Sequence, residues 1–333
     1  MTDTGEPCIL YGELYTKYKS EVISDIFSKT DIDTRKLVKS KANDVIIPCS
    51  GETAVDIATA RCVPYDNILL GGDLNIIRLY DCDGSFMSYQ LNGKRKYDIA
   101  KVAQGVSVVH LYGDHLKGVK TYNPCLEEQK KIAKLLSLLD ERITTQNKII
   151  DKLQSLIKGI AQKIVHSNKP NVCLSECLEC KSSTLQESEV CEQGTYPVYG
   201  ANGIVGYLDN YNTEGEAVYI IKDGSGVGTV SYVTGKCSAT GTLNTLQAKE
   251  GYSLQYLYYL LKVFNFEPYK TGMAIPHIYF KDYGKAKVFC PSYTEQLRYA
   301  RLLSAIDNKL SIEQNIITEL RIQKQYLLRQ MFI

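Results

Sequence analysis

Two long stretches of the chain place their apolar residues alternately three and four positions apart. This spacing is a heptad seam and predicts two amphipathic helices that pack along one face. Each seam covers a rod roughly 50 Å long at about 1.5 Å per residue. Pro124 and Pro170 bracket the first stretch, as prolines at helix boundaries do. The first seam contains Ile132, Leu136, Leu139, Ile143, Gln146, Ile150, Leu153, Ile157, Ile160 and Ile164, and the second contains Tyr299, Leu303, Ile306, Leu310, Glu313, Ile317, Leu320, Lys324, Leu327 and Met331.

The second stretch repeats the first at one constant offset in the numbering, without a gap. Pro124, Glu128, Gln129, Asp140 and Ile150 recur as Pro291, Glu295, Gln296, Asp307 and Ile317, and the register extends upstream from Gly105, His110 and Tyr112 to Gly272, His277 and Tyr279. A unit this long that occurs only twice is not a solenoid. The repeat predicts two similar halves that end in the same helix. Pairing of the two helices within the chain is therefore favoured over the alternative, a dimerisation coiled coil.

The segments before the two helices have a different pattern. They contain short β-type runs separated by Gly, Asn and Asp, and a shorter helix is predicted in each, most clearly at Leu254–Phe264. The predicted strands are Asp44–Pro48, Asn75–Tyr80, Ala217–Lys222 and Thr229–Thr234, with strand-like runs at Lys117–Asn123 and Lys285–Cys290. We therefore predict an α+β protein in which two domains, 1–123 and 168–290, alternate with two long helices, 124–167 and 291–333, that pair as an antiparallel coiled coil.

Composition narrows the class of protein. With 333 residues, the chain can bury two or three cores. It has no unbroken apolar run of the length that a transmembrane helix needs, so no membrane span is expected. The start, Met1–Glu6, lacks the features of a signal peptide. Eleven cysteines fit reduced thiols in the cytoplasm better than a disulfide framework.

The net charge of +2 is unevenly distributed. The globular segments 1–123 and 168–290 carry 15 and 10 Lys/Arg against 16 and 12 Asp/Glu. The helical segments 124–167 and 291–333 carry 8 and 6 Lys/Arg against 5 and 4 Asp/Glu. A protein that grips nucleic acid by itself usually has a clear basic surface. If this chain binds DNA, a partner is therefore expected to supply much of the phosphate contact.

The order of domains and helices resembles the specificity subunit of type I restriction–modification systems over nearly the whole length. The helix openings that begin at Pro124 and Pro291 resemble that family's P-x-x-x-E-Q-x-x-I-A motif, and Asp140 and Asp307 stand at its usual aspartate. Four further segments resemble its recognition domains: 48–53, 71–75, 196–207 and 220–228. Nothing before Gly5 corresponds to the leading stretch 169–195 of the second domain, so the resemblance implies that the first domain is shortened at its N-terminus.

The resemblance implies a non-catalytic subunit that recognises double-stranded DNA. Each domain would read one half of a split site, and the helices would hold the domains apart and dock two methyltransferase subunits. Restriction/translocase subunits would join them, and S-adenosylmethionine, ATP and Mg would belong to those partners, with no cofactor in this chain. The residues expected on the spacer and its docking surface are Glu128, Gln129, Asp140, Gln146, Glu295, Gln296, Asp307 and Glu313.

Candidate DNA contacts come from the turn-rich segments. The candidates are Ser50, Gly51, Thr53, Lys94, Arg95, His110, Tyr199, Asn202, Gly203, Lys222, Ser225, Lys270, Thr271 and His277. Gly224–Gly228 has the glycines of a dinucleotide loop, but a strand follows it rather than a helix, so a hairpin turn is the preferred interpretation. His110 and His277 have no neighbouring base or nucleophile that would predict catalysis.

Three other functional classes have partial support in the sequence. Cys173, Cys177, Cys180 and Cys191 have a spacing that metal sites use, but plain thiols are preferred, and we expect no metal. A self-contained DNA methyltransferase has little support, because Asn123–Leu126 only superficially matches that catalytic motif. The remaining alternative is a two-headed coiled-coil scaffold that binds proteins rather than DNA.

Overall fold

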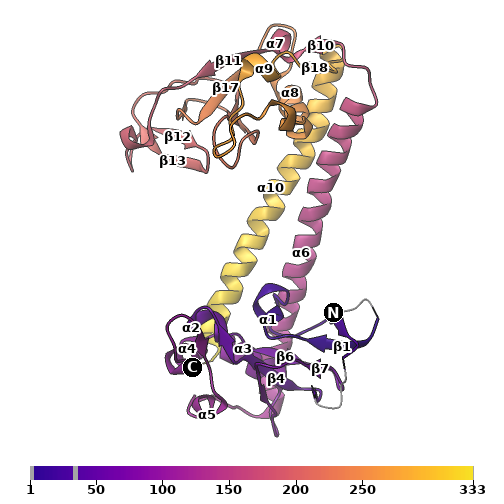
Figure 1. Ribbon diagram of the computed structural model, residues 1–333, viewed down its shortest axis with the longest axis vertical. Helices are drawn as coiled ribbons and strands as arrows, with labels where there is room; N and C mark the ends of the chain where they lie inside the picture. The colour runs from indigo at the N-terminus through magenta and orange to yellow at the C-terminus, as the bar shows by residue number, and fades with distance from the viewer. Residues whose placement is uncertain (1–3, 33–36, 333) are drawn as a thin grey trace. The chain divides into compact units, whose positions relative to one another are not determined.

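The computed structural model describes residues 4–32 and 37–332 (Figure 1). Its contacts divide the chain into unit 1, residues 1–148 and 314–333, and unit 2, residues 149–313. Both cuts fall inside the long helices, so each unit contains one globular α+β part and a portion of both helices. Met1–Asp3, on which the expectation of no signal peptide partly rests, and Ile333 lie outside the described residues. The four-part domain boundaries stay a prediction.

The two predicted long helices are present and begin at equivalent positions of the repeat. They are α6 (Leu126–His166) and α10 (Tyr293–Gln330). In unit 1, Leu136 of α6 lies in the same buried cluster as Leu328 of α10. In unit 2, Ile157 of α6 lies in one cluster with Leu303 of α10. The early part of each helix thus packs against the late part of the other, which confirms the antiparallel pairing.

The seam positions predicted from the spacing are buried or half-buried along both helices. The polar seam residues Gln146 and Glu313 are buried too, and Glu313 forms an ion pair with Lys309 one turn away. None of the helices in the described ranges combines the length and apolarity needed to span a bilayer.

Unit 1 contains short strands and helices around its core. Its strands are β1 (Glu6–Ile9), β2 (Ser28–Thr30), β3 (Val38–Lys39), β4 (Asp44–Pro48), β5 (Ser50–Gly51), β6 (Arg61–Val63), β7 (Leu69–Leu70), β8 (Leu74–Ile77) and β9 (Val109–His110). They form the sheets β2-β1-β7-β3, β6-β4-β8 and β5-β9. Its short helices are α1 (Glu13–Thr16), α2 (Ala54–Ile57), α3 (Gly84–Asn92), α4 (Lys96–Val102) and α5 (Gly113–Leu116).

Unit 2 is built around a four-stranded sheet. Its strands are β10 (Val172–Cys173), β11 (Leu178–Ser182), β12 (Tyr196–Gly200), β13 (Gly203–Leu208), β14 (Ala217–Ile221), β15 (Val230–Val233), β16 (Ser238–Ala239), β17 (Leu243–Ala248) and β18 (Lys287–Val288). The sheets are β11-β17-β14-β15, β13-β12-β16 and β10-β18. Its short helices are α7 (Leu174–Cys177), α8 (Leu254–Val263) and α9 (Phe280–Tyr283).

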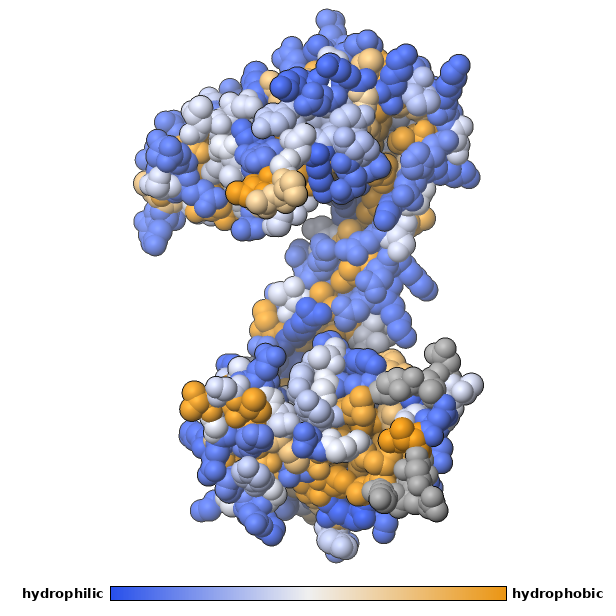
Figure 2. Space-filling model, in the orientation of Figure 1, coloured by the Kyte–Doolittle hydropathy of each residue, from blue (hydrophilic) through white to orange (hydrophobic). Residues whose placement is uncertain are grey.

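The central strand β14 is buried on both faces, which explains its unbroken apolar sequence. Val218 and Ile220 lie in the cluster that includes α8 and both long helices. Tyr219 and Ile221 face the opposite way and pack with residues of β16 and β17. Side chains alternate across a strand, so a strand covered on both faces cannot show a polar–apolar alternation. Figure 2 shows that polar side chains cover most of the visible surface of both globular parts, with apolar ones between them.

Most of the predicted short elements are found, but the prediction of a strand at Lys117–Asn123 is wrong. In unit 2, the equivalent segment forms β18, which pairs with β10. In the described part of unit 1, no strand pairs with Lys117–Asn123. The buried amide of Gln90 instead donates to the Tyr122 carbonyl at 2.7 Å and accepts from the Tyr122 N–H at 2.7 Å. A side chain thus satisfies the backbone groups that a neighbouring strand would otherwise bond.

Candidate nucleic-acid interface

A glutamine joins each long helix to the globular part before it. Gln129 donates to the Pro124 carbonyl at 2.8 Å and accepts from the N–H of Asp83, the N-cap of α3, at 2.9 Å. Gln296 repeats this with the Pro291 carbonyl and the N–H of Ser253, the N-cap of α8, at 2.9 Å each. Both glutamines are 2% exposed. Their two bonds fix the angle at which each long helix leaves its globular part.

An aspartate makes a second joint further along each long helix. The Tyr89 hydroxyl donates to Asp140 at 2.7 Å, and the Tyr259 hydroxyl donates to Asp307 at 3.2 Å. Burial, together with the adjacent carboxylate, raises the pKa of both phenols, so each stays protonated and can donate. The two joints therefore use the same chemistry in the two units.

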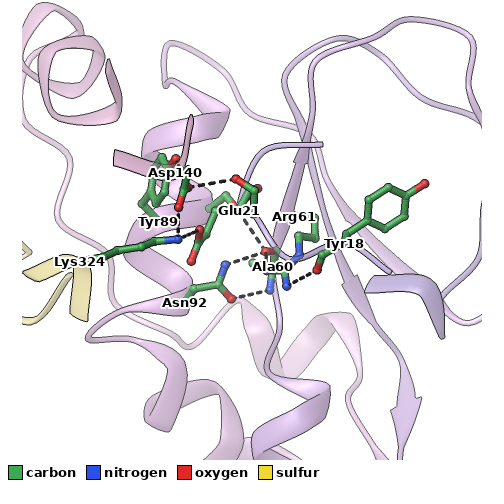
Figure 3. A network of polar contacts seen from close by, with 10 residues as sticks. Tyr18, Glu21, Ala60, Arg61, Tyr89, Asn92, Asp140 and Lys324 are labelled. Carbon is green, nitrogen blue, oxygen red and sulfur yellow. Dashed lines mark hydrogen bonds and ion pairs between the residues drawn. The ribbon is translucent and has the colours of Figure 1, made fainter. Parts of the chain in front are cut away.

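In unit 1 alone, the aspartate joint extends into a buried ionic network (Figure 3). The Lys324 ammonium of α10 pairs with Asp140 of α6 at 2.5 Å and also with Glu21. The Ser20 hydroxyl donates to Asp140 at 3.0 Å. Burial raises the pKa of Glu21, although the Lys324 charge opposes this. In the described part of unit 2, Asp307 accepts from Tyr259 and forms an ion pair with the more exposed Lys262, 3.9 Å away.

Next to the network, the buried Arg61 guanidinium is held by backbone carbonyls. It donates to Ala60 at 3.0 Å and to Tyr18 at 2.9 Å (Figure 3). Burial lowers its pKa from the ordinary value. Asn92 of α3 bonds both backbone groups of Ala60, at 2.7 and 2.9 Å. These bonds fix the chain before β6 against α3.

Several residues that were expected on a docking surface are instead buried within this chain. Gln129, Asp140, Gln296 and the seam residues Gln146 and Glu313 are buried by this chain itself, and Asp307 is half-buried. Because a partner protein could not reach the buried side chains, they act as internal joints and seam residues. Glu128 and Glu295 remain exposed, and so do the basic residues Lys130, Lys131, Lys134, Lys148 and Lys152 of α6.

The same loop precedes the short helix α5 in unit 1 and α9 in unit 2. In unit 1, Gln104 and His110 exchange backbone hydrogen bonds of 2.9 and 2.7 Å. In unit 2, Thr271 and His277 exchange bonds of the same two lengths. Gly105 and Gly272 follow at equivalent positions with φ of +122° and +89°. A Cβ on either glycine would collide with a carbonyl oxygen across the loop, so both positions require glycine.

The base of each loop is fixed to another segment of its unit, a strand in unit 1 and the turn after β14 in unit 2. In unit 1, β9 pairs with β5, which places Ser50 opposite His110. In unit 2, Asp223 bridges His277, and the two side chains meet at 2.6 Å between Oδ1 and Nδ1. Each histidine ring also stacks on the tyrosine two residues later, with centroids 6.2 and 6.5 Å apart. The two units therefore present one preformed loop each.

Comparisons with known proteins decide the family. The family model described as the type I restriction modification DNA specificity domain matches residues 10–155 and 167–321, one copy for each half of the repeat. The chain belongs to this family. It is a DNA sequence-recognition subunit of a type I restriction–modification complex, and the protein-binding scaffold alternative is not favoured.

Individual relatives of the type I specificity family are distant. A putative type I specificity subunit of Mycoplasma genitalium is 25% identical over 287 residues, covering 78% of this chain and 73% of the relative. One from Mycoplasma pneumoniae is 25% identical, covering 73% and 76%. The crystal structure of a type I restriction-modification S subunit from M. genitalium has a TM-score of 0.68 at 21% identity, covering 98% of this chain and 92% of that one. At that identity, the structural likeness supports the fold alone.

In this type I specificity subunit, the structure brings some of the predicted DNA contacts together. Ser50, Gly51 and His110 share the β5–β9 pair. In unit 2, Lys222, Lys270, Thr271 and His277 surround the base of the loop: the Ile278 N–H donates to the Lys222 carbonyl at 2.9 Å, and Lys270 precedes Thr271. Ser225 lies exposed in the adjoining turn, where the Gly224 N–H donates to the Pro276 carbonyl at 3.0 Å.

Other predicted contacts lie elsewhere. Lys94 and Arg95 are at the turn between α3 and α4, and not with Ser50 and His110. Lys94 lines a hollow with Gln325 and Arg329 of α10, and Arg95 forms an ion pair with Asp98. The Tyr199 ring lies 5.6 Å from that of Tyr219, and the exposed Asn202 and Gly203 form the β12–β13 turn. The Thr53 hydroxyl is used as the N-cap of α2. Because α2 contacts β5 and β9, Thr53 still lies close to the loop of unit 1. The other residues of this group are not brought to either loop by the contacts described.

Two residues at the loop were missed from the sequence. Asp223, the partner of His277, stands in a glycine-rich turn where only the tertiary fold reveals its neighbour. Lys281 lies over the ring of Tyr279, 5.3 Å from its centroid. The repeat had already identified Tyr279, which recurs with His277 at the common offset, but it gave no sign of the lysine beside it.

The cysteine-rich stretch of unit 2 forms part of the core. The Cys177 and Cys290 sulfurs lie 3.8 Å apart in a buried site, and Cys191 is exposed. Within residues 4–32 and 37–332, no group of three or more His, Cys, Asp or Glu side chains is arranged to hold a metal ion. Burial of Cys177 and Cys290 is thus explained by packing.

Proposed function

We propose that this chain reads a DNA site in two separate parts, one through the globular part of each unit, and that it does no chemistry itself. The observation that carries the proposal is the recurrence, at one constant offset, of the loop, the glutamine joint and the aspartate joint. Two similar readers, each joined to both helices of an antiparallel pair, match the pseudo-two-fold arrangement of a split DNA site.

The long helices are proposed to dock two methyltransferase subunits, one for each copy of the repeat. Support comes from the exposed Glu128 and Glu295, which open both helices, and from the exposed lysines of α6. A structural relative with a TM-score of 0.54 is described in connection with complex assembly and conformational transition of a type I system. Restriction/translocase subunits would join this assembly. S-adenosylmethionine, ATP and Mg would be supplied by the partners, in the cytoplasm, where the many unpaired thiols would remain reduced.

The test is a map of DNA methylation. The chain would be expressed with a methyltransferase subunit of its own system in a host that lacks such activity, and methylated adenines would be located by long-read sequencing. A split motif with a fixed unread gap is expected. An assembled, active complex that methylates without a split motif would refute the proposal.

A domain exchange assigns each half of the motif. Replacing 168–290 by the corresponding segment of another family member should change one half-site and leave the other intact. A change in both halves would contradict the division of labour. The unchanged half serves as the internal control for folding and assembly.

A further inference from the structure

Each of the two equivalent loops has a fully exposed apolar residue at its tip. Val106 is 98% exposed and Met273 is 107% exposed, and they occupy the same position of the repeat. Two residues later, Val108 and Ile275 are 51% and 58% exposed. A single exposed apolar residue needs no explanation. Here the same exposure recurs in both units, at one position of a loop that is otherwise tightly constrained.

The loops hold these tips on rigid bases. The paired backbone bonds close each loop, and the required glycine starts it. Five residues after the tips, Leu111 and Ile278 are 0% and 1% exposed and anchor the chain in the core of each unit. A contact group presented by a preformed loop loses little conformational entropy on binding. The arrangement is thus suited to recognition, whereas a flexible tip would have to be ordered first.

The surroundings of the unit 2 tip favour a polyanion as the binding partner. Lys222, Lys270 and Lys281 border the loop, and His277 stands at its base. Lys270 forms an ion pair with Glu267, and the His277 ring contacts the Asp223 carboxylate. The net positive charge around the loop is therefore moderate. An apolar residue on a loop whose neighbouring segments carry lysines matches a DNA groove, where phosphates flank the apolar edges of bases.

We propose that Met273 and Val106 are apolar probes, each of which contacts bases in the half-site read by its own unit. This inference rests on the proposed function. Two features of DNA offer the required apolar surface: the C5-methyl group of thymine in the major groove and the face of a base exposed at an opened step. The two residues differ in length and shape, so the two half-sites would be probed to different depths.

The test uses the assembled methyltransferase complex and a duplex carrying the mapped site. Met273→Ser should weaken binding by about tenfold or more, judged from the apolar surface of a methionine side chain. The loss should disappear when the unit 2 half-site is mutated. Val106→Ser should act in the same way, and more weakly, on the other half-site. Each variant is the matched control for the other, and Met273→Leu should restore binding.

Two DNA modifications distinguish the apolar sources. If uracil in place of thymine in the unit 2 half-site reproduces the loss and is not additive with Met273→Ser, the methyl group is the target. If 2-aminopurine fluorescence rises on binding of the wild type and not of Met273→Ser, an opened step is the target. Unchanged DNA affinity of both serine variants would overturn the inference. It would also be overturned if these variants lost assembly with the methyltransferase while their contacts with DNA stayed intact. A wild-type complex without a split motif would instead defeat the proposed function itself.

Discussion

Lys324→Met removes the only cation that contacts both Glu21 and Asp140 in the described structure, and keeps most of the side-chain volume. The three side chains are 13%, 9% and 10% exposed, so water cannot replace the ammonium. Removing one partner of a buried ionic group typically costs about 3–5 kcal/mol. We expect a loss of that size in the free energy of unfolding of unit 1 at pH 8.

The loss should shrink as the pH falls. Burial already raises the pKa of Glu21, and without the Lys324 charge that pKa rises further. The unfolded pKa of a glutamate is about 4.3, and the folded pKa of Glu21 lies above it. The protonated carboxyl contributes its full stabilisation below the unfolded pKa, and this contribution to the free energy of unfolding is lost as the pH rises through the folded pKa. Between the two values, the variant loses about 1.4 kcal/mol per pH unit. Near pH 5, the cost should therefore fall to about 1 kcal/mol.

Hydrogen exchange measured by mass spectrometry separates the two units within one sample. Peptides from α3 and from the last turns of α10 report on unit 1, and peptides from β14 and α8 serve as the control. Lys262→Met is the matched variant in unit 2: its ammonium lies 3.9 Å from Asp307, and the two side chains are 33% and 29% exposed. It should cost less than about 1 kcal/mol at any pH. An equal loss for Lys324→Met at pH 5 and pH 8 would refute the reasoning.

The joints, the loop and the helices each give a further prediction. Gln296→Ala should lower the stability of α8 by about 1–3 kcal/mol, measured by hydrogen exchange, because the Ser253 N–H loses its buried acceptor. Gly272→Ala should lower the melting temperature more than Gly235→Ala. Both have positive φ, +89° and +85°, but only at Gly272 would a Cβ collide with backbone; equal shifts would contradict this. Deleting one heptad from both helices should change the unread gap of the methylated motif by a fixed length; an unchanged motif with full activity would exclude a spacer role.

The long helices could be predicted because their burial follows from periodicity alone. A residue in a heptad seam faces its partner helix whatever the rest of the chain does. Pairing within the chain was favoured by the two copies of the helix, and the antiparallel direction was implied by the family resemblance. The strand-like run Lys117–Asn123 failed because a strand is defined by its neighbour. Its counterpart at Lys287–Val288 has β10 beside it, while Tyr122 is bonded by the side chain of Gln90.

Individual residues of the site could be predicted from the sequence, but which of them lie together in the fold could not. The repeat identified His110 and His277 as equivalent, and the structure places them in equivalent loops. Recurrence alone could not separate residues kept for internal joints from residues kept for partners. Gln129 and Gln296 were therefore assigned to a docking surface, although their amides bond the chain's own backbone. The partnership of His277 with Asp223 depends on a bridge between segments that are far apart in the sequence, which no local pattern encodes.

The asymmetry of the two aspartate joints bears on why the helices pair within one chain. Lys324 and Ile157 occupy the same position of the repeat, so α6 and α10 are alike in outline and differ in charge there. If the early part of α6 paired with the late part of α6 from a second copy, Ile157 would take the place of Lys324. Glu21 and Asp140 would then be buried without their cation, at a cost of about 3–5 kcal/mol for each such contact. The apolar seam permits both pairings, and the single lysine favours the chain's own second helix.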